Sequence, residues 1–381
     1  MLTGARGVSL RYAPSWLESG FALSEDLPLL DMERLPVERE TAVGAVDDAR
    51  PDRWGERVIR HIERPPRLSL LEMLYFAGDE RFGALGVSTS ADAYEPHQRG
   101  PLPQLGDADQ VNELVRKVLA GEPVPEAQRR FIAPGATMGG GRPKALIEID
   151  GAQWVLKFSE DAGSSEPLIE HATVTLAARA GITVAETRPV SLARGTAVAV
   201  KRFDRAPGAR IHALSAHVAL RAAGAEMSYP ALAQLLRRRG PTEGNRNRLQ
   251  MRELFRRLVF NILIDNTDDH EKNHVLLMDD AQHYELAPTF DVLPTGLALG
   301  YQSMIVGERG AESSIENALS MGRAYWLDPR QAIDEVATVV ATVDGWQAHF
   351  ALCGVPPALI EQYAAQIDRI ELLEQRRRFS V

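Results

Sequence analysis

The pattern of apolar and polar positions changes character about half-way along the chain. In the first half, short alternating stretches predict strands, and those at 145–149 and 153–158 flank Asp150-Gly151, which favours a two-residue hairpin turn. Apolar residues then recur at helical spacing, which predicts helices at 166–180, 213–222, 229–239, 250–264, 330–342 and 357–374. A small sheet followed by a helical bulk favours an α+β protein with a sheet lobe and a larger helical lobe.

The first hundred residues predict a small α/β subdomain of their own. Their spacing indicates short elements, namely strands at 7–12 and 82–87 and helices at 56–62 and 69–76. The stretch 96–107 is rich in proline, glycine and polar residues, which is typical of a linker. We therefore expect an amino-terminal subdomain at 1–110, a sheet lobe at 111–203 and a helical lobe at 204–381.

Composition and charge narrow the class of protein. The balance of 45% hydrophobic and 25% charged residues is ordinary for a globular protein. A net charge of −9 argues against nucleic-acid binding over the whole surface. Runs such as Arg237-Arg238-Arg239 leave a local basic patch open, although a solvated helix face is the simpler interpretation. The single cysteine, Cys353, excludes an intrachain disulfide. No signal-peptide or membrane-span pattern is visible, so we expect a cytoplasmic protein with no membrane partner.

The stretch NTDDHEKNHVLLMD, residues 266–279, holds the densest candidate chemistry. His270 to His274 matches HExxH, a zinc-protease signature that requires one continuous helix. The sequence instead predicts a turn and then a strand at 274–278, so a zinc site is disfavoured. Asp268 and Asn273 have the D-x-x-x-x-N spacing of a kinase catalytic loop, and Asp291 follows after a hairpin. A carboxylate base and two Mg²⁺ ligands are one interpretation, and a polar loop without chemistry is the other.

Two earlier features fit phosphoryl transfer, although each is weak alone. Gly139-Gly140-Gly141-Arg142-Pro143-Lys144 precedes a strand, and glycines let backbone N–H groups approach phosphates. A flexible turn is the simpler interpretation. Lys157 lies in an apolar strand, where it needs a partner, and Glu170 in the next helix is the candidate. A strand lysine, a helix glutamate, the D-x-x-x-x-N spacing and a later aspartate occur here in the order found in kinases. This combination is more specific for a kinase than any one of the features alone.

At these motifs the chain resembles the HipA family, the serine/threonine-kinase toxins of bacterial toxin–antitoxin pairs. The resemblance rests on PDRWG (51–55), GDERFGAL (78–85), GGRPKA (140–145), KRFDR (201–205), NTDDHEKNH (266–274) and LAPTFDV (286–292). It implies a bilobal protein-kinase-like fold and a dependence on ATP and Mg²⁺.

The resemblance also implies roles for single residues. Asp268 is similar to the catalytic aspartate, Asn273 and Asp291 to the Mg²⁺ ligands, and Lys157 to the ATP lysine held by Glu170. The remaining nucleotide contacts that it implies are Gly139, Gly140, Gly141, Arg142 and Lys144 of the phosphate loop, Lys201 and Phe203 of the adenine hinge, and His270 and Lys272. Thr137 occupies the place of a silencing autophosphorylation site.

The function that the resemblance implies is a toxin kinase acting on a protein, an aminoacyl-tRNA synthetase in known relatives. Its expected partner is a HipB-like helix-turn-helix antitoxin, which would make most of the contact with DNA. A non-catalytic, nucleotide-binding corepressor that works through the antitoxin is the alternative. A phosphotransferase acting on a small molecule is a third option, because fold alone does not set the substrate.

Overall fold

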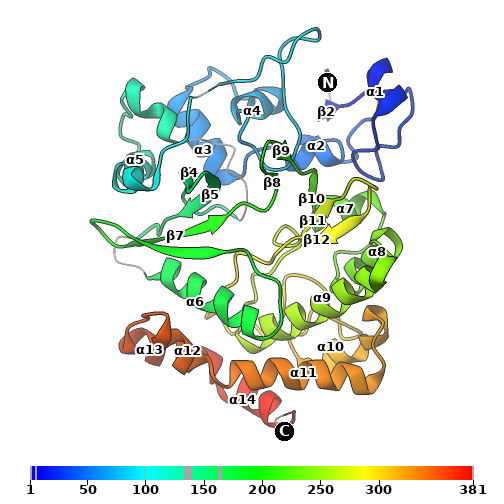
Figure 1. Ribbon diagram of the computed structural model, residues 1–381, viewed down its shortest axis with the longest axis vertical. Helices are drawn as coiled ribbons and strands as arrows, with labels where there is room; N and C mark the ends of the chain where they lie inside the picture. The colour runs from blue at the N-terminus through cyan, green and yellow to red at the C-terminus, as the bar shows by residue number, and fades with distance from the viewer. Residues whose placement is uncertain (1, 5–6, 99, 133–139, 162–164, 380–381) are drawn as a thin grey trace. The chain divides into compact units, whose positions relative to one another are not determined.

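The structure, a computed structural model, describes residues 2–4, 7–98, 100–132, 140–161 and 165–379. The chain divides into two units (Figure 1). Unit 1 comprises Met1–Ser164 and Val190–Ala223, and unit 2 comprises Ser165–Pro189 and Gly224–Val381. Strand β6 (Thr187–Ser191) spans the limit between the units. The three-part division expected from the sequence stays a prediction.

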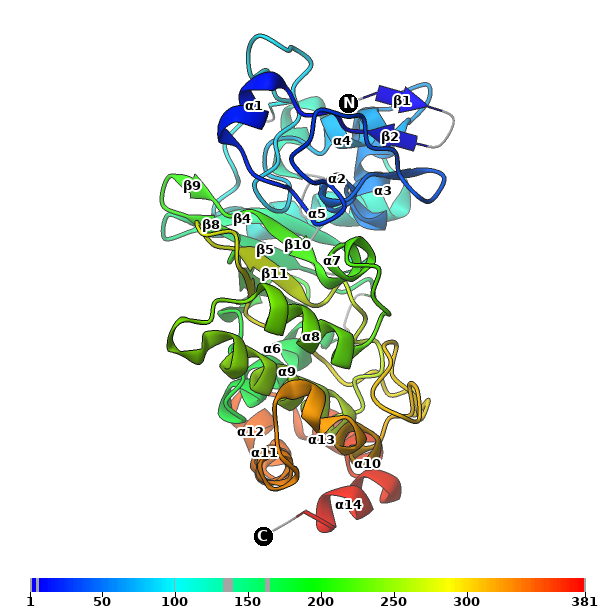
Figure 2. The same ribbon diagram turned by 90° about the vertical axis from the view of Figure 1, so that its right-hand side faces the viewer.

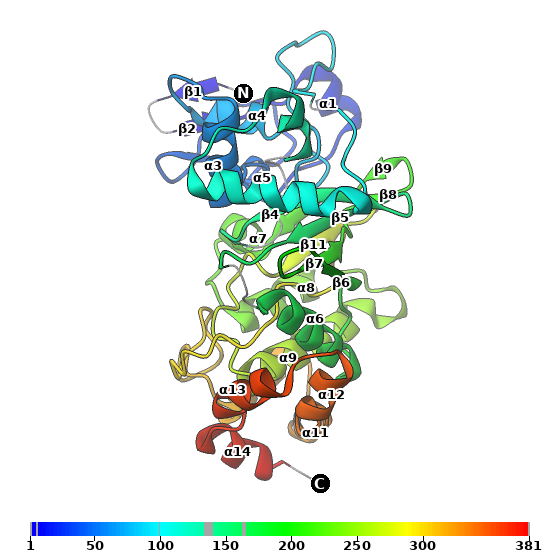
Figure 3. The same cartoon turned by 90° about the vertical axis from the view of Figure 1, so that its left-hand side faces the viewer.

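Three antiparallel strands of a four-stranded sheet, whose order is β4-β5-β7-β6, form the centre of unit 1. They are β4 (Lys144–Ile149), β5 (Ala152–Lys157) and β7 (Thr196–Lys201). Asp150 and Gly151, which join β4 to β5, both have positive φ (52° and 73°), as the tight Asp-Gly turn requires. Helix α5 (Ala108–Ala120), which the sequence analysis did not predict, lies along β4 (Figure 3). It buries Val111 and Val115 against the sheet, together with Trp54 of α3 (Arg53–Ile62).

The rest of unit 1 consists of short elements around this sheet. They are β1 (Leu2–Gly4), β2 (Gly7–Ser9), α1 (Pro14–Ser19), β3 (Thr41–Ala42), α2 (Ala45–Asp48), α4 (Leu70–Phe76), η1 (Leu105–Asp107), η2 (Glu126–Phe131), β8 (Arg205–Ala206), β9 (Ala209–Arg210), β10 (Ala213–Ser215) and α7 (Ala216–Ala222). Ser69 and Glu72 form a capping box that starts α4, where the sequence predicts a helix.

The strand predicted at 82–87 is wrong, because side chains take up its backbone groups. Gly83 N donates to Asp204 Oδ2 at 2.8 Å, and Gly83 O accepts from Arg205 Nη1 at 2.9 Å. The carbonyl of Arg81 accepts from both Arg202 and Arg205. Backbone groups satisfied in this way have no need of a neighbouring strand. The predicted strand at 7–12 likewise ends at Ser9.

Unit 2 is mostly helical and is built around α9 (Arg246–Leu263), which packs beside α8 (Tyr229–Arg239) (Figure 2). Leu254, Phe255 and Leu258 of α9 are fully buried. The other elements are α6 (Glu166–Arg179), η3 (Glu243–Asn245), β11 (Val275–Met278), β12 (Tyr284–Leu286), α10 (Ile315–Ser320), η4 (Gly322–Tyr325), α11 (Pro329–Val343), α12 (Trp346–Leu352), α13 (Pro357–Ile367) and α14 (Ile370–Arg377). Within the described ranges, no helix has the length and apolar character needed to cross a membrane.

Two helix predictions need correction. The helix predicted at 213–222 starts only at Ala216, because Ser215 is its N-cap and accepts a hydrogen bond from Val218 N at 3.2 Å. The helix predicted at 357–374 is broken at Asp368. Its carboxylate accepts hydrogen bonds from Trp346 Nε1 (3.1 Å) and Arg376 Nη2 (2.5 Å), and these contacts fix the turn between α13 and α14.

Candidate active site

The DDHEKN stretch of unit 2 follows the carboxyl end of α9 and is tied down where it begins. Asp265, fully buried, has a positive φ of 59°, which turns the chain out of the helix. Its carboxylate pairs with Arg369 at 2.6 Å. Its carbonyl oxygen accepts from Thr295 N (3.1 Å) and Thr295 Oγ1 (2.8 Å). The loop therefore leaves the helix in a fixed direction.

Asp269 is the buried anchor of the loop. Its Oδ2 accepts from Asn261 Nδ2 at 2.8 Å, lies 2.7 Å from His274 Nε2, and accepts from the hydroxyl of Tyr229. Burial opposes ionisation, but His274 and these hydrogen bonds outweigh it and hold the pKa of Asp269 below its usual range. Burial and the neighbouring carboxylate raise the pKa of Tyr229 well above its usual value, so its hydroxyl stays a donor.

Asp268, which directly precedes Asp269, faces solvent instead of the protein interior. It is exposed, while Thr267 and Asp269 on either side are 3% exposed. Within the ranges that the structure describes, its carboxylate has no hydrogen bond or ion pair. The anchored neighbours fix the backbone at Asp268. Little backbone entropy is therefore lost when this carboxylate binds a ligand. A free, positioned carboxylate is the group that a reacting hydroxyl needs.

Asn273 offers a buried oxygen that nothing in the described chain satisfies. The residue is 4% exposed, and its Oδ1 has no hydrogen-bond partner among the described residues. Its backbone N donates to His270 O at 2.9 Å, and its Nδ2 donates to Asp268 O at 3.3 Å, so the side chain is oriented. A buried oxygen without a donor is costly unless a ligand uses it. An amide oxygen is an oxygen ligand of the kind that Mg²⁺ binds.

The β11–β12 hairpin places the chain after β12, which leads to Asp291, near the chain before β11, which holds Asn273. The two strands pair antiparallel with Leu276 opposite Leu286, and Ala287 N donates to Val275 O at 2.8 Å. Residues just before β11 and just after β12 therefore meet at one end of the hairpin. Asp291 has a positive φ of 58° there. Amide and carboxylate oxygens are both ligands that Mg²⁺ accepts, and the joint binding of Mg²⁺ by Asn273 and Asp291 stays a prediction.

The zinc interpretation of HEKNH is excluded by the local structure. His270 to His274 form turns and bends, so the two histidines do not share a helix face. His274 is buried and engaged with Asp269. In the part of the chain that the structure describes, no cluster of three or more histidine, cysteine or acidic side chains could hold a metal.

The nucleotide residues expected in the sheet belong to unit 1. Lys157, at the end of β5, is 3% exposed and is paired in register with Lys144 and Val198. Glu170, its expected partner, is 1% exposed on α6 of unit 2. Buried ions require partners of opposite charge, and the pairing of Lys157 with Glu170 stays a prediction. Thr137 and Gly139 lie outside the described residues.

Lys144 has a structural contact that the sequence analysis did not foresee. Its side chain is fully buried, and its ammonium pairs with Asp52 and donates to Gly140 O at 2.5 Å. Trp54 Nε1 donates to Lys144 O at 2.7 Å. Lys144 therefore joins β4 to the start of α3, and a role for it in phosphate binding stays a prediction.

A buried ionic network holds the predicted hinge, residues 201–203. Asp204 is fully buried and accepts from Arg202 Nε and Arg205 Nη1, both at 2.9 Å. Burial opposes ionisation of Asp204, but the two guanidinium groups outweigh it and lower its pKa. The backbone N of Arg202 donates to Gln153 O at 3.0 Å, and Lys201 Nζ lies 5.8 Å from the ring centroid of Trp154. The hinge backbone is thus fixed against β5.

Comparison with known proteins decides the family. A family model described as the HipA-like C-terminal domain matches residues 136–346, more than half of the chain. The chain belongs to the HipA-like family. The resemblance stated from the motifs is thereby confirmed.

One curated relative and one solved structure extend this finding. The HipA-like chain is 30% identical over 248 residues to "Putative kinase Y4dM" of Sinorhizobium fredii, which covers 61% of this chain and 56% of that protein. The chain thus spans little more than half of that relative's length. In the Shewanella oneidensis MR-1 complex of HipA, HipB and operator DNA, a chain matches with a TM-score of 0.63 and 18% identity. The match covers 97% of this chain and 92% of that one, and it confirms the α+β, protein-kinase-like fold.

Sequence reasoning missed the residues that hold this HipA-like loop. Asp269 and Asp265 are buried acids, but the motif gives no sign that Asp268 between them is the exposed one. Tyr229 and Asn261, which bind Asp269, come 40 and 8 residues earlier in the chain. The usable signal was an asparagine on the apolar helix 250–264, a position that suggests a buried polar contact.

Proposed function

We propose that this HipA-like chain is a Mg·ATP-dependent protein serine/threonine kinase, the toxin of a bacterial toxin–antitoxin pair. The observation that carries the proposal is the pairing of an exposed, partner-free Asp268 with the anchored Asp269 and the unsatisfied amide oxygen of Asn273. Relatives in the family include a protein named as a putative kinase. Phosphoryl transfer depends mainly on positioning of the reactants and on charge stabilisation, and the buried Asp269 fixes the loop that carries Asp268.

In the proposed reaction, Asp268 orients the hydroxyl of a serine or threonine and accepts its proton. The hydroxyl oxygen forms a bond to the γ-phosphorus of ATP, the bond from that phosphorus to the β,γ-bridging oxygen breaks, and ADP leaves. Asn273 and Asp291 would hold Mg²⁺, which would supply positive charge to the phosphate oxygens. Lys157 contacts the α- and β-phosphates, and the backbone at 201–203 receives the adenine. His270 and Lys272 add nucleotide contacts.

The partners follow from the family and stay part of the proposal. The HipA structure similar to this chain was solved with HipB and operator DNA, which supports a HipB-like antitoxin that carries most of the DNA contact. A translation factor, such as an aminoacyl-tRNA synthetase, is the proposed protein substrate. Self-phosphorylation at Thr137 would place negative charge where nucleotide phosphates bind and so would silence the kinase.

The test is phosphate transfer from labelled ATP by the purified chain, with Mg²⁺, to itself and to proteins of a bacterial lysate. We expect Asp268→Asn to lower the transfer rate by at least about 100-fold, the usual contribution of a positioned base. Asp280→Asn, which removes an exposed carboxylate from the turn between β11 and β12, is the matched control and should leave the rate unchanged.

Peptide mapping of the labelled chain would show whether Thr137 carries the phosphate. Full activity in the Asp268→Asn variant would refute the assigned base. ATP binding without transfer to any protein would instead favour the nucleotide-binding corepressor.

A further inference from the structure

A groove of about 810 Å³ lies in unit 2, between the end of α8, the start of α9, η4 and the start of α11. Its lining is strongly basic and aromatic, and includes Arg237, Arg248, Arg252, Arg323, Tyr325 and Trp326. Asp328 is the one acid among the lining residues. The volume falls within the range of small-ligand pockets.

Three of these arginines keep their charge uncompensated. Arg252 pairs with the buried Glu335, which also binds Arg256. Over the described part of the chain, Arg237, Arg248 and Arg323 have no carboxylate within ion-pair distance. Like charges in one groove repel one another, and only Arg252 has a carboxylate partner among the described residues. Binding of an anion would relieve the repulsion among the other three guanidinium groups.

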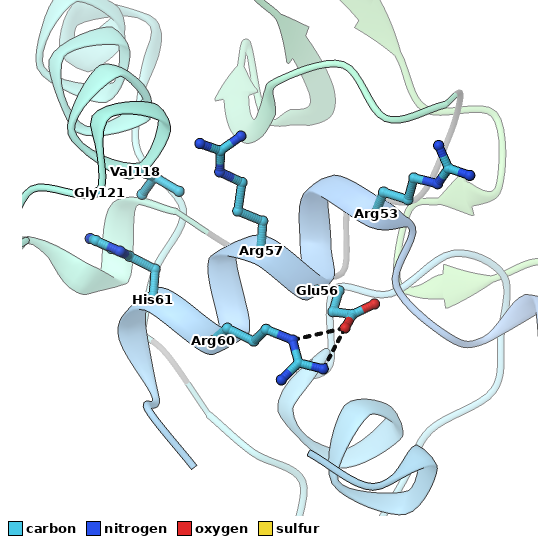
Figure 4. A pocket seen from close by; sticks show the side chains of 7 residues that line it. All are labelled: Arg53, Glu56, Arg57, Arg60, His61, Val118 and Gly121. Atoms are coloured by element: carbon cyan, nitrogen blue, oxygen red, sulfur yellow. Dashed lines mark hydrogen bonds and ion pairs between the residues drawn. The ribbon is translucent and has the colours of Figure 1, made fainter. Parts of the chain in front are cut away.

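A basic pocket in unit 1 differs, because three of its cationic side chains already have partners within the fold (Figure 4). There Arg60 pairs with Glu56 at 2.7 Å, and Arg57 donates to Leu119 O at 2.5 Å. His61 Nε2 lies 2.6 Å from Glu122 O. These contacts use the charges for the fold itself, whereas the groove in unit 2 leaves its charges available.

Trp326 holds two of the free guanidinium groups in place. The Cζ atoms of Arg237 and Arg248 lie 4.4 Å and 3.9 Å from centroids of its ring system. Stacking on an aromatic ring orients a guanidinium and leaves its N–H donors at the edge, where they can bind phosphate oxygens in pairs. Trp326 itself is 40% exposed and has a positive φ of 62°, which is rare for a large side chain.

Tyr325 forms part of the packed layer beneath the groove. The residue is fully buried against Phe255, with ring centroids 5.1 Å apart. Its hydroxyl is buried as well, so the groups that the groove offers to a ligand are the guanidinium groups above this layer.

The groove is separate from the candidate active site within the same unit. Leu249 lines the groove near the start of α9, and the catalytic loop follows Leu263 at its other end. At about 1.5 Å per helical residue, this separation is about 21 Å. A ligand in the groove would therefore not occupy the place of the transferred phosphate.

We propose that this groove binds a nucleoside polyphosphate at a second site, with Arg237, Arg248 and Arg323 on the phosphates. An adjoining cavity of about 440 Å³ shares Arg323 with it and is lined largely by apolar side chains such as Leu319 and Met321. That space suits the less polar nucleoside, whereas inorganic polyphosphate would leave it unused. The proposal stands whether or not the chain is a kinase.

Calorimetric titration of the full chain with ATP tests the site by counting. We expect the triple variant Arg237→Gln, Arg248→Gln, Arg323→Gln to bind one ATP fewer per chain than the wild type. If the active site also binds ATP, the count falls from two to one; if it does not, the count falls from one to none. A count that is equal in the two proteins overturns the proposal.

A matched triple variant controls for the loss of charge. Arg60→Gln, Arg188→Gln and Arg309→Gln remove three guanidinium groups that are already paired with carboxylates, and should leave the ATP count unchanged. Tripolyphosphate is the second probe and should bind at least about tenfold more weakly than ATP. Equal affinities would overturn the nucleoside part of the proposal. Binding of a 20-nucleotide RNA that needs the three arginines, with an unchanged ATP count, would overturn it in favour of nucleic acid.

Discussion

Replacing aspartate by asparagine should affect the free energy of unfolding very differently at the adjacent positions 268 and 269. Asp269 is buried, and three donors converge on one of its oxygens. Asparagine in its place keeps the shape but loses the charge. A hydrogen bond to a charged group contributes about 1.5–3 kcal/mol and a neutral one about 1 kcal/mol. With about 1 kcal/mol lost for each of three bonds, Asp269→Asn should lower the free energy of unfolding by about 3 kcal/mol.

Asp268→Asn should change that free energy by no more than about 0.5 kcal/mol, because the side chain is exposed and bonded to nothing described. Urea unfolding, followed by circular dichroism, measures both variants against the wild type. An Asp269→Asn protein that unfolds at the same urea concentration as the wild type would refute the reasoning, and so would a large loss of stability in Asp268→Asn.

The pH dependence gives the same prediction a second readout. The pKa of Asp269 is lowered in the folded chain, so its charged form stabilises the fold at any pH above the unfolded value of about 3.9. That contribution is lost as the pH falls through the folded pKa. The difference in unfolding free energy between wild type and Asp269→Asn should therefore be constant above about pH 5 and shrink below about pH 4.

Three further substitutions test other parts of the molecule. Asn273→Ala should raise the Mg²⁺ concentration for half-maximal phosphate transfer at least about tenfold, since it removes a proposed ligand, and a Mg²⁺ titration of the rate measures this. Lys144→Met should cost about 3 kcal/mol in urea unfolding because it leaves the half-buried Asp52 without its counter-ion, and adding Asp52→Asn should recover part of that loss in a double-mutant cycle. Ser69→Ala should cost about 1 kcal/mol, measured in the same way, because it removes the capping box of α4.

The sequence by itself determined the features that a few neighbouring residues encode. The Asp150-Gly151 hairpin and helix α8 lie where the pattern predicts them, because turn chemistry and apolar spacing act within one or two turns of chain. The ordered motifs also led to the HipA-like family, which the comparisons confirm. The roles of the individual site residues stay predictions, although the structure shows Asp268 exposed and Asn273 with an unused oxygen.

Only the tertiary structure decided which polar groups are buried and what holds them. Asp52 and Lys144 are 92 residues apart in sequence, and Tyr229 and Asp269 are 40 residues apart. Gly83 joins Asp204 across 121 residues, and this contact replaces the strand that local alternation predicts at 82–87. The spacing of apolar residues indicates whether a segment prefers a helix or a strand. The burial and pairing of its polar groups, however, depend on the rest of the fold. For this reason the difference between Asp268 and its anchor Asp269 appears only in three dimensions.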